Sequence, residues 1–245
     1  MKNYSRFLKP AALILAVVLF AGGFLACRAQ GDSAVETKGD FTGLELHTGV
    51  SVTYVQGPYK PVKITGDKEK VAFVEVRRKG NILEIHHKSR GRNVNINGND
   101  VKITVQAPSV REFDLSVGAT LDVNGNLVAK GDVDFDLGTG AVVNVGSISA
   151  PKIQIDCSTG AVVNLSGVKT ERMEVDCSTG AVANLTGTVG YLEIDCGTGA
   201  VLNASGLKAQ SGEIEAGTGA HVDVNIRDVK SLEKGIGAEV TNHAR

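Results

Sequence analysis

The sequence predicts an all-β protein, a single-domain, parallel, right-handed β-helix with coils of about 20 residues, whose N-terminal strands cap or start the solenoid. Three observations lead to this fold class. A hexapeptide ending in Gly-Ala recurs at that period, apolar and polar residues alternate between its copies, and the chain combines 30 glycines with 5 prolines and no tryptophan. Folds made of many short strands and tight turns have this composition.

The repeat is clearest at residues 156–161, where Asp-Cys-Ser-Thr-Gly-Ala recurs unchanged at 176–181 and with one change at 195–200. Weaker copies lie at 136–141 and 215–220. The glycine before each alanine is Gly118, Gly140, Gly160, Gly180, Gly199, Gly219 or Gly237. Because glycine adopts a positive φ without strain, we expect each of these positions to be a corner between two strands.

Each coil has three apolar sides. The first side lies just before the corner, at positions such as Ile155 and Cys157, and the second lies just after it, at positions such as Val163 and Leu165. The third side comprises Leu127, Ile148, Val168, Val189, Leu207 and Val229. Three apolar sides per coil predict a β-helix whose coils lie about 4.8 Å apart and stack like residues on like. Right-handed coiling is the rule for parallel crossovers.

The first 29 residues have the pattern of an export signal. Basic residues precede an apolar run from Ala11 to Phe24, which is too short for a typical transmembrane helix. Two processing routes are open. The sequence Phe-Leu-Ala-Cys ending at Cys27 resembles a lipoprotein signal, which would lipidate Cys27, whereas signal peptidase I could instead cut after Ala29. Residues 30–39 are expected to form a tether, so the sequence predicts an exported protein of the cell envelope, at the outer membrane as a lipoprotein or in the periplasm or at the cell surface.

Residues 40–245 form the predicted β-helix domain, with repeat coils over about 111–241. Residues 40–110 also alternate apolar with polar and are punctuated by turn residues, so they read as strands that cap or begin the solenoid. No helix of useful length is expected there. His86 and His87 fall in a local basic cluster, but adjacent strand residues point to opposite faces, and their spacing indicates no metal site.

The charge of the repeat region indicates which class of partner to exclude. Residues 111–245 contain 18 acidic and 10 basic residues, which argues against nucleic acid as a partner. An acidic residue stands four positions before each corner glycine and points outward. The candidate metal ligands among them are Asp136, Asp156, Asp176, Asp195 and Glu215. Stacked carboxylates repel one another, and Ca²⁺ would relieve that repulsion through oxygen ligands, although a hydrated acidic face without an ion explains the pattern as well.

A second outward column is apolar. Val142, Val162, Val182 and Val201 are expected to stack into a flat stripe, which indicates a candidate interface or a surface covered by the N-terminal strands. Asparagines two positions further on are expected to form a hydrogen-bonded ladder. Cys157, Cys177 and Cys196 fall in one inward column, where they serve as small buried side chains, or one neighbouring pair forms a disulfide.

The order of motifs resembles one family. Thr48-Gly49-Val50-Ser51-Val52, then Val62-Lys63-Ile64-Thr65-Gly66-Asp67, Gly80-Asn81-Ile82-Leu83-Glu84-Ile85 and Val101-Lys102-Ile103-Thr104-Val105 precede the Gly-Ala repeats. This order is similar to that of the putative auto-transporter adhesin, head GIN domain family, exported proteins common in Bacteroidetes. The resemblance runs from about residue 40 to the C-terminus and implies an adhesin-like β-helix of the cell envelope. It supplies no catalytic residues.

The function expected from these patterns is a non-enzymatic envelope protein that binds a protein or glycan ligand or associates with itself, contacts the membrane through a lipid anchor alone, and needs no cofactor apart from Ca²⁺ if the acidic column is occupied. The sequence contains no nucleophile elbow, phosphate loop, paired-cysteine zinc motif or Ser/His/Asp arrangement. Two alternatives remain. One is a Ca²⁺-assisted, lyase-like carbohydrate-active enzyme using the acidic column and Arg172, and the other is a rigid periplasmic spacer.

Overall fold

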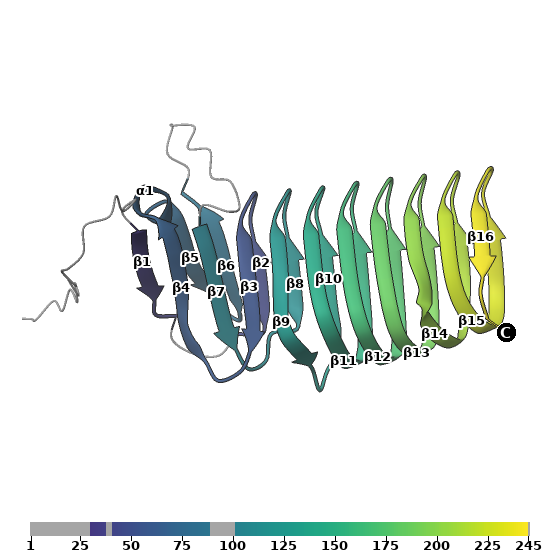
Figure 1. The fold of residues 1–245 in the computed structure, drawn as a ribbon, viewed down its shortest axis with the longest axis horizontal. Helices are drawn as coiled ribbons and strands as arrows, with labels where there is room; N and C mark the ends of the chain where they lie inside the picture. Colours follow the sequence, from purple (N-terminus) through teal and green to yellow (C-terminus); the bar gives the residue numbers. More distant parts are fainter. Residues whose placement is uncertain (1–29, 38–40, 89–100, 245) are drawn as a thin grey trace, which may run out of the picture.

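A computed structural model of the chain describes residues 30–37, 41–88 and 101–244. These residues form a β-solenoid of about seven turns, with the coils stacked side by side along one long axis (Figure 1). The predicted export signal, including Cys27, lies outside the described residues. Within the described residues, no helix is long and apolar enough to cross a membrane.

The coils are built from long strands that run from one corner to the next. The C-terminal strands are β11 (Val142–Cys157), β12 (Val162–Cys177), β13 (Val182–Cys196), β14 (Val201–Ala216), β15 (His221–Lys234) and β16 (Glu239–Asn242). They pair in parallel and in register, with Val142 beside Val162 and Cys157 beside Cys177. The repeat therefore stacks like residues on like, and the parallel β-helix predicted from the sequence is confirmed.

Each corner is a tight turn at a glycine, which threonine precedes in all but the first and last of the corners predicted from the repeat. At Gly180 φ is +67°, and the Ala181 amide donates to the Ser178 carbonyl at 3.0 Å. A Cβ added at Gly180 would meet no atom within 4 Å. Glycine is therefore required here because the backbone is left-handed, a conformation that strains other residues. There is room for a larger side chain at this position.

The core fills the interior of the solenoid and changes character along its length. At the N-terminal end Phe113 stacks on Phe135 with ring centroids 5.0 Å apart, and Tyr54 meets Phe113 edge-on at 5.7 Å. The Tyr54 hydroxyl donates to the Ala107 carbonyl at 2.8 Å, and burial raises the pKa of Tyr54 to about 12. In the later coils cysteine and alanine occupy the column that leucine occupies at the start.

The N-terminal end does not follow the order of the sequence. Its strands are β2 (Gly43–Leu46), β3 (Ser51–Gln56), β6 (Ile82–His87), β7 (Val101–Ala107), β8 (Glu112–Leu115), β9 (Thr120–Val128) and β10 (Val133–Leu137). Strands β2 and β3 pair in parallel with β8 and β9 on one side and with β6 and β7 on the other. The coil at residues 43–56 therefore lies between two coils that come later in the chain.

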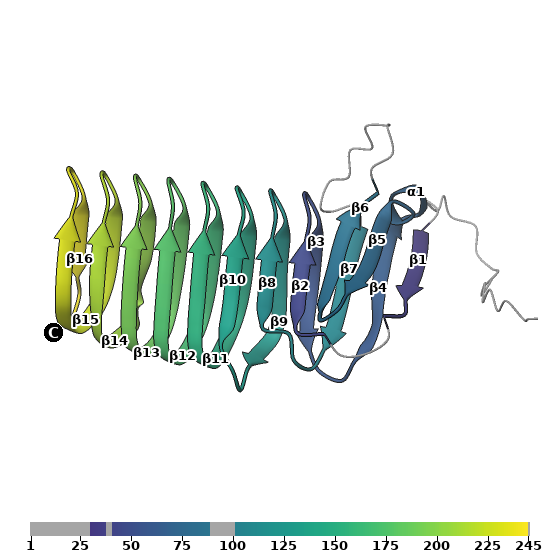
Figure 2. The same ribbon diagram turned by 180° about the vertical axis from the view of Figure 1, so that it is seen from behind.

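Antiparallel strands close this end of the solenoid, as Figure 2 shows from behind. They are β1 (Gln30–Val35), β4 (Lys60–Asp67) and β5 (Val74–Lys79), with the one-turn helix α1 (Lys68–Val71) between β4 and β5. Strand β4 covers the edge of β7, and β5 covers the edge of β6. These strands cap the array, as expected from residues 40–110, and the predicted lack of a helix of useful length there is consistent with α1 being four residues long.

Two expectations differ from the structure. Residues 30–39 were expected to form a tether, but Gln30–Val35 form β1 and pair with β4 across six residues, because the otherwise open edge of β4 offers backbone partners. Val229, expected on an inward side, is 36% exposed, and Leu232, in the column that Ile155 begins, is 48% exposed. Both lie in the part of β15 that has β14 on one side and no described strand paired to it on the other.

Candidate functional site

The acidic column predicted from the sequence forms a ladder on one outward face. Asp136 lies beside Asp156, Asp156 beside Asp176, Asp176 beside Asp195, and Asp195 beside Glu215. The register continues through Asp114 and Glu233, and also through Glu45 and Glu84 of the N-terminal strands, which sequence analysis missed. We call this column of nine carboxylates the acidic ladder. Glu45 could have been found, since it stands four positions before Gly49 of a Thr-Gly turn, as the other carboxylates stand before their corner glycines, whereas Glu84 precedes no such turn.

The ladder is electrostatically strained in its middle. Partial burial, together with the neighbouring carboxylates Asp114 and Asp156, raises the pKa of Asp136. Partial burial and the neighbours Asp195 and Asp156 raise the pKa of Asp176 in the same way. Proton uptake or a bound cation would relieve this repulsion. Whether Ca²⁺ occupies the ladder stays a prediction.

Two further outward columns precede the ladder, one two residues earlier that includes Glu174 and Glu193, and one four residues earlier that contains the counter-charges Lys152 and Arg172. Arg172 Nε donates to Glu174 at 2.7 Å and Nη2 to Glu193 at 2.5 Å, and its guanidinium lies 4.8 Å from the ring centroid of Tyr191. Lys152 Nζ contacts Glu174 at 2.6 Å. Arg172 is therefore held by neighbouring coils, and the lyase-like role considered for it would require these contacts to break.

The N-terminal end of the ladder differs from the rest. Among the described residues, one group of three brings possible metal-ligand atoms within 4.8 Å of one another, and it comprises Glu45, His47 and Glu84. An adjoining pocket of about 220 Å³ is lined by several carboxylates and no basic residue. None of the three residues was among the candidate metal ligands proposed from the repeat.

The valine stripe lies on a different face. Val142, Val162, Val182 and Val201 stack in register as expected, and each is half-buried between its neighbours. Thr120 precedes the stripe and His221 follows it. The role of this stripe as an interface stays a prediction.

Beside the valines runs a ladder of asparagine amides. Asn164 donates to Asn144, Asn184 to Asn164, and Asn203 to Asn184, each at 2.7 Å. Asn144 donates in turn to Asp122 at 2.8 Å. Each of these amides donates one N–H to the preceding coil, so the ladder joins coils together.

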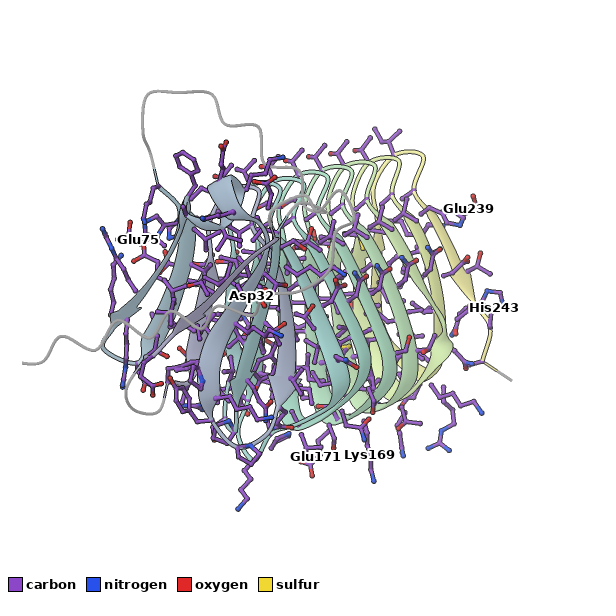
Figure 3. The ribbon with its side chains drawn as sticks, turned by 60° about the vertical axis from the view of Figure 1, so that its left-hand side comes forward. Asp32, Glu75, Lys169, Glu171, Glu239 and His243 are labelled. Atoms are coloured by element: carbon purple, nitrogen blue, oxygen red, sulfur yellow. The ribbon has the colours of Figure 1, made fainter. Side chains whose placement is uncertain are left out.

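One large concave surface was not foreseen. A groove of about 830 Å³ crosses the lower corner of successive coils, where Figure 3 shows Lys169 and Glu171 projecting away from the strands. Its floor contains buried Ala150, Val189 and Ala209, and its rim carries Lys169, Lys208 and Arg227. This groove could not be predicted from the repeat, because its residues belong to the variable third side of each coil.

The cysteine column is buried. Cys157, Cys177 and Cys196 are free thiols, so the structure supports small buried side chains over the disulfide alternative. The neighbouring Cys177 thiol and burial raise the pKa of Cys157, and the same causes raise that of Cys196. These thiols face the core and do not contribute to a surface site.

The stacked ladders define the class of the protein, a β-solenoid whose side chains repeat along its length. The chain belongs to the family described as putative auto-transporter adhesin, head GIN domain, whose model matches residues 40–233. The resemblance stated from the motifs is thereby confirmed. An adhesin family points to the cell surface or envelope. No curated protein of established function matches the chain.

Solved structures share the fold at low sequence identity. A putative adhesin from Parabacteroides distasonis has a TM-score of 0.69 and 14% identity, over 86% of this chain and 95% of that one. A putative lipid binding protein from the same species has a TM-score of 0.67 and 13% identity, over 86% and 94%. A putative adhesin from Bacteroides fragilis has a TM-score of 0.59 and 17% identity, over 86% and 95%.

Proposed function

We propose that this protein is a non-enzymatic, adhesin-like binding module of the cell envelope that holds an extended, anionic glycan in its corner groove. Membership of an adhesin family supports the general role. The observation that carries the ligand class is the groove, which crosses several coils and combines an apolar floor with a rim of three basic residues and one acidic residue, Glu171, on an otherwise acidic solenoid.

The dimensions of the groove fit a polymer. Ser149, Lys169, Thr188 and Lys208 follow one another in register along its rim, so polar groups recur at each coil, about 4.8 Å apart. This spacing is comparable to the length of one sugar unit. Lys169 and Lys208 have no carboxylate partner among the salt bridges of the described residues, which leaves their charges available to acidic groups on a ligand.

The proposal does not include turnover. A glycan lyase needs a base and a charge-stabilising cation converging on one bond. The acidic ladder instead spreads its carboxylates along a strand face, and Arg172 is engaged by Glu174 and Glu193. The lyase-like alternative is therefore not favoured.

The proposal also includes the location of the protein, at the cell envelope. The basic and apolar leader, with Cys27 as the candidate lipidation site, supports export and attachment to a membrane by lipid. A spacer role would use the same anchor without the groove. Labelling cells with a fatty acid probe, with Cys27→Ser as the comparison, tests the anchor separately from the ligand.

Ligand binding can be tested by calorimetric titration of the purified protein with polygalacturonate as the anionic glycan and dextran as the neutral one. We expect binding of polygalacturonate alone, weakened at least tenfold by the double substitution Lys169→Glu and Lys208→Glu and by added salt. Lys63→Glu on β4 is the matched control, because Lys63 is exposed and lies away from the groove.

Equal binding of both glycans, or equal affinities of the groove variant and the control, would contradict the proposal. Binding to phosphatidylglycerol vesicles without binding to glycan would assign the groove to a lipid instead. Release of unsaturated sugar products during incubation with Ca²⁺ would restore the enzymatic alternative.

A further inference from the structure

Two copies of the pattern Glu-x-His lie side by side at the N-terminal end of the acidic ladder. Glu45-Leu46-His47 is on and just after β2, and Glu84-Ile85-His86 is on β6. The strands are parallel with Glu45 beside Glu84, and the His47 amide donates to the Ile85 carbonyl at 3.0 Å. Residues two apart on a strand share a face, so two carboxylates and two imidazoles gather on one outward surface.

Three of these side chains already converge. His47 Nε2 lies 2.9 Å from Glu84 Oε1 and 3.1 Å from Glu45 Oε1. In a tetrahedral zinc site with bonds of about 2.0–2.1 Å, ligand atoms lie roughly 3.3 Å apart. The two distances from His47 therefore need to change by a few tenths of an ångström, and the two carboxylate oxygens already lie within 4.8 Å of each other. Glu84 is 6% exposed, which places one ligand in a protected position.

His86 lies beside this group and is the candidate fourth ligand, although its ring nitrogens are not within 4.8 Å of all three ligand atoms, so the ring must move toward them. Its Nε2 faces Glu75 Oε2 at 3.4 Å, and Figure 3 shows Glu75 at the edge of this end of the molecule. Its Nδ1 is buried without a hydrogen-bond partner and lies 3.9 Å from Glu84 Oε1. A carboxylate on one ring nitrogen with the other nitrogen directed at a metal is the usual arrangement of histidine ligands. The buried, unpartnered Nδ1 is thus an observation independent of the acidic cluster.

We infer that Glu45, His47, Glu84 and His86 form a binding site for a divalent transition metal of the Zn²⁺ class. Two imidazoles among four ligands favour such an ion over Ca²⁺, which takes oxygen ligands. Lys79 contacts the other oxygen of Glu84, Oε2, at 2.9 Å and leaves Oε1 for the metal. The ion would join β2 to β6 and fasten the capping coil to its neighbour.

The test is a calorimetric titration of the purified, EDTA-treated protein with Zn²⁺, together with the visible absorption spectrum of the Co²⁺ form. We expect one ion per chain, a Co²⁺ spectrum typical of four-coordinate imidazole ligation, and an increase in Tm on metal addition. His47→Gln and His86→Gln should each weaken Zn²⁺ binding at least tenfold, and Glu75→Gln, which acts through His86, should weaken it about tenfold or more.

His221→Gln is the matched control, because His221 also lies between carboxylates, at 3.5 Å from Asp223 and 3.4 Å from Glu239. Its affinity for Zn²⁺ should equal that of the unsubstituted protein. Absence of stoichiometric uptake, or equal affinities in all four variants, would overturn the inference. If a variant has a lower Tm than the unsubstituted protein in EDTA, the Co²⁺ spectrum of the unsubstituted protein is the deciding measurement. A spectrum typical of oxygen-only ligation would also overturn the inference.

Discussion

At the residue scale, the solenoid uses glycine for two different reasons. Gly180 holds a φ of +67° in open space, whereas a Cβ at Gly212 would lie 2.2 Å from the Leu192 carbonyl oxygen of the preceding coil. The first position constrains the backbone conformation, and the second constrains the distance between stacked strands.

These two reasons predict different costs. Gly180→Ala should destabilise the fold by about 1 kcal/mol, because alanine is strained in the left-handed region. Gly212→Ala should cost several times more, because two strands must separate to admit the methyl group. Thermal melting measures both variants, and Gly180→Asn should lie closer to the unsubstituted protein than Gly180→Ala does. Equal losses at the two glycines would contradict this distinction.

A second prediction concerns one carboxylate of the acidic ladder. Asp176→Asn should stabilise the fold at pH 7 by about 0.5–1 kcal/mol at low salt, because adjacent carboxylates repel by roughly 1 kcal/mol in water. The gain should shrink in 0.5 M NaCl, where screening shortens the range of the repulsion. Denaturant unfolding at the two salt concentrations measures it. A gain that does not depend on salt would point to a cause other than charge.

At the scale of elements, the long strands β11 to β14 are held in register by side-chain ladders as well as by their backbones. Asn164 both donates to Asn144 and accepts from Asn184, whereas Asn203 donates to Asn184 at the end of the ladder. Asn164→Ala should therefore cost about 1–2 kcal/mol and Asn203→Ala about half as much. Chemical denaturation of both variants tests this order, and the reverse order would show that the amides act independently of their neighbours.

The pairing of the repeated strands could be predicted from sequence because the corner motif in each coil sets its register with the next coil. The position of the Thr-Gly corner placed Asp156 beside Asp176 and Val162 beside Val182 without any structure. Strand β2 is followed by such a corner, at Thr48-Gly49, but β6 is followed by none. Their pairing joins Glu45 to Glu84 across 39 positions of sequence, so the approach of His86 to His47 could not be foreseen, although the opposite directions of His86 and His87 could.

The groove escaped prediction for a related reason. Its floor and rim come from the third side of each coil, where residues differ from one repeat to the next and register shifts interrupt the pairing, as between Leu165 and Val168. Such shifts change the path of the backbone, and the shape of the groove depends on that path. Hydrophobic periodicity predicts which residues are buried but does not predict where the backbone shifts.

At the scale of the whole molecule, the acidic face predicts an unusual dependence of stability on pH. The pKa values of Asp114, Asp134, Asp136 and Asp176 are raised by partial burial and by acidic neighbours. Carboxyl groups with a higher pKa in the folded chain bind protons more tightly there, so the free energy of unfolding increases as the pH falls from 7 towards the ordinary Asp pKa.

Glu174 and Glu84 act in the opposite direction. Lys152 and Arg172 lower the pKa of Glu174, and Lys79 lowers that of Glu84, so their contribution to stability is lost as the pH falls through those lowered values. Stability should therefore peak at about pH 4–5. Melting curves from pH 3 to 8 in EDTA locate the peak, and a steady decrease of Tm from pH 7 to 5 would contradict the prediction.

The stacking of coils predicts tolerance to the removal of a whole repeat. Deleting residues 161–180 joins Gly160 to Ala181 and allows Cys157 to stack on Cys196, so the shortened chain should fold with a reduced Tm. Deleting residues 161–170 alone should abolish cooperative unfolding, because it removes half a coil and places corners against strands. Circular dichroism and thermal melting compare the two deletions, and similar behaviour of both would contradict the modular description.

The interleaved N-terminal end has a consequence for how the chain assembles. The coil at residues 43–56 lies between β8 and β9 on one side and β6 and β7 on the other, all of which follow it in sequence. Neither edge of this coil can be completed when residue 56 has just emerged from a ribosome or a membrane channel. Completion waits until about residue 128, so the first coil in the sequence is secured only after the strands on both sides of it have emerged, and this part of the chain can remain extended while it is being threaded across a membrane.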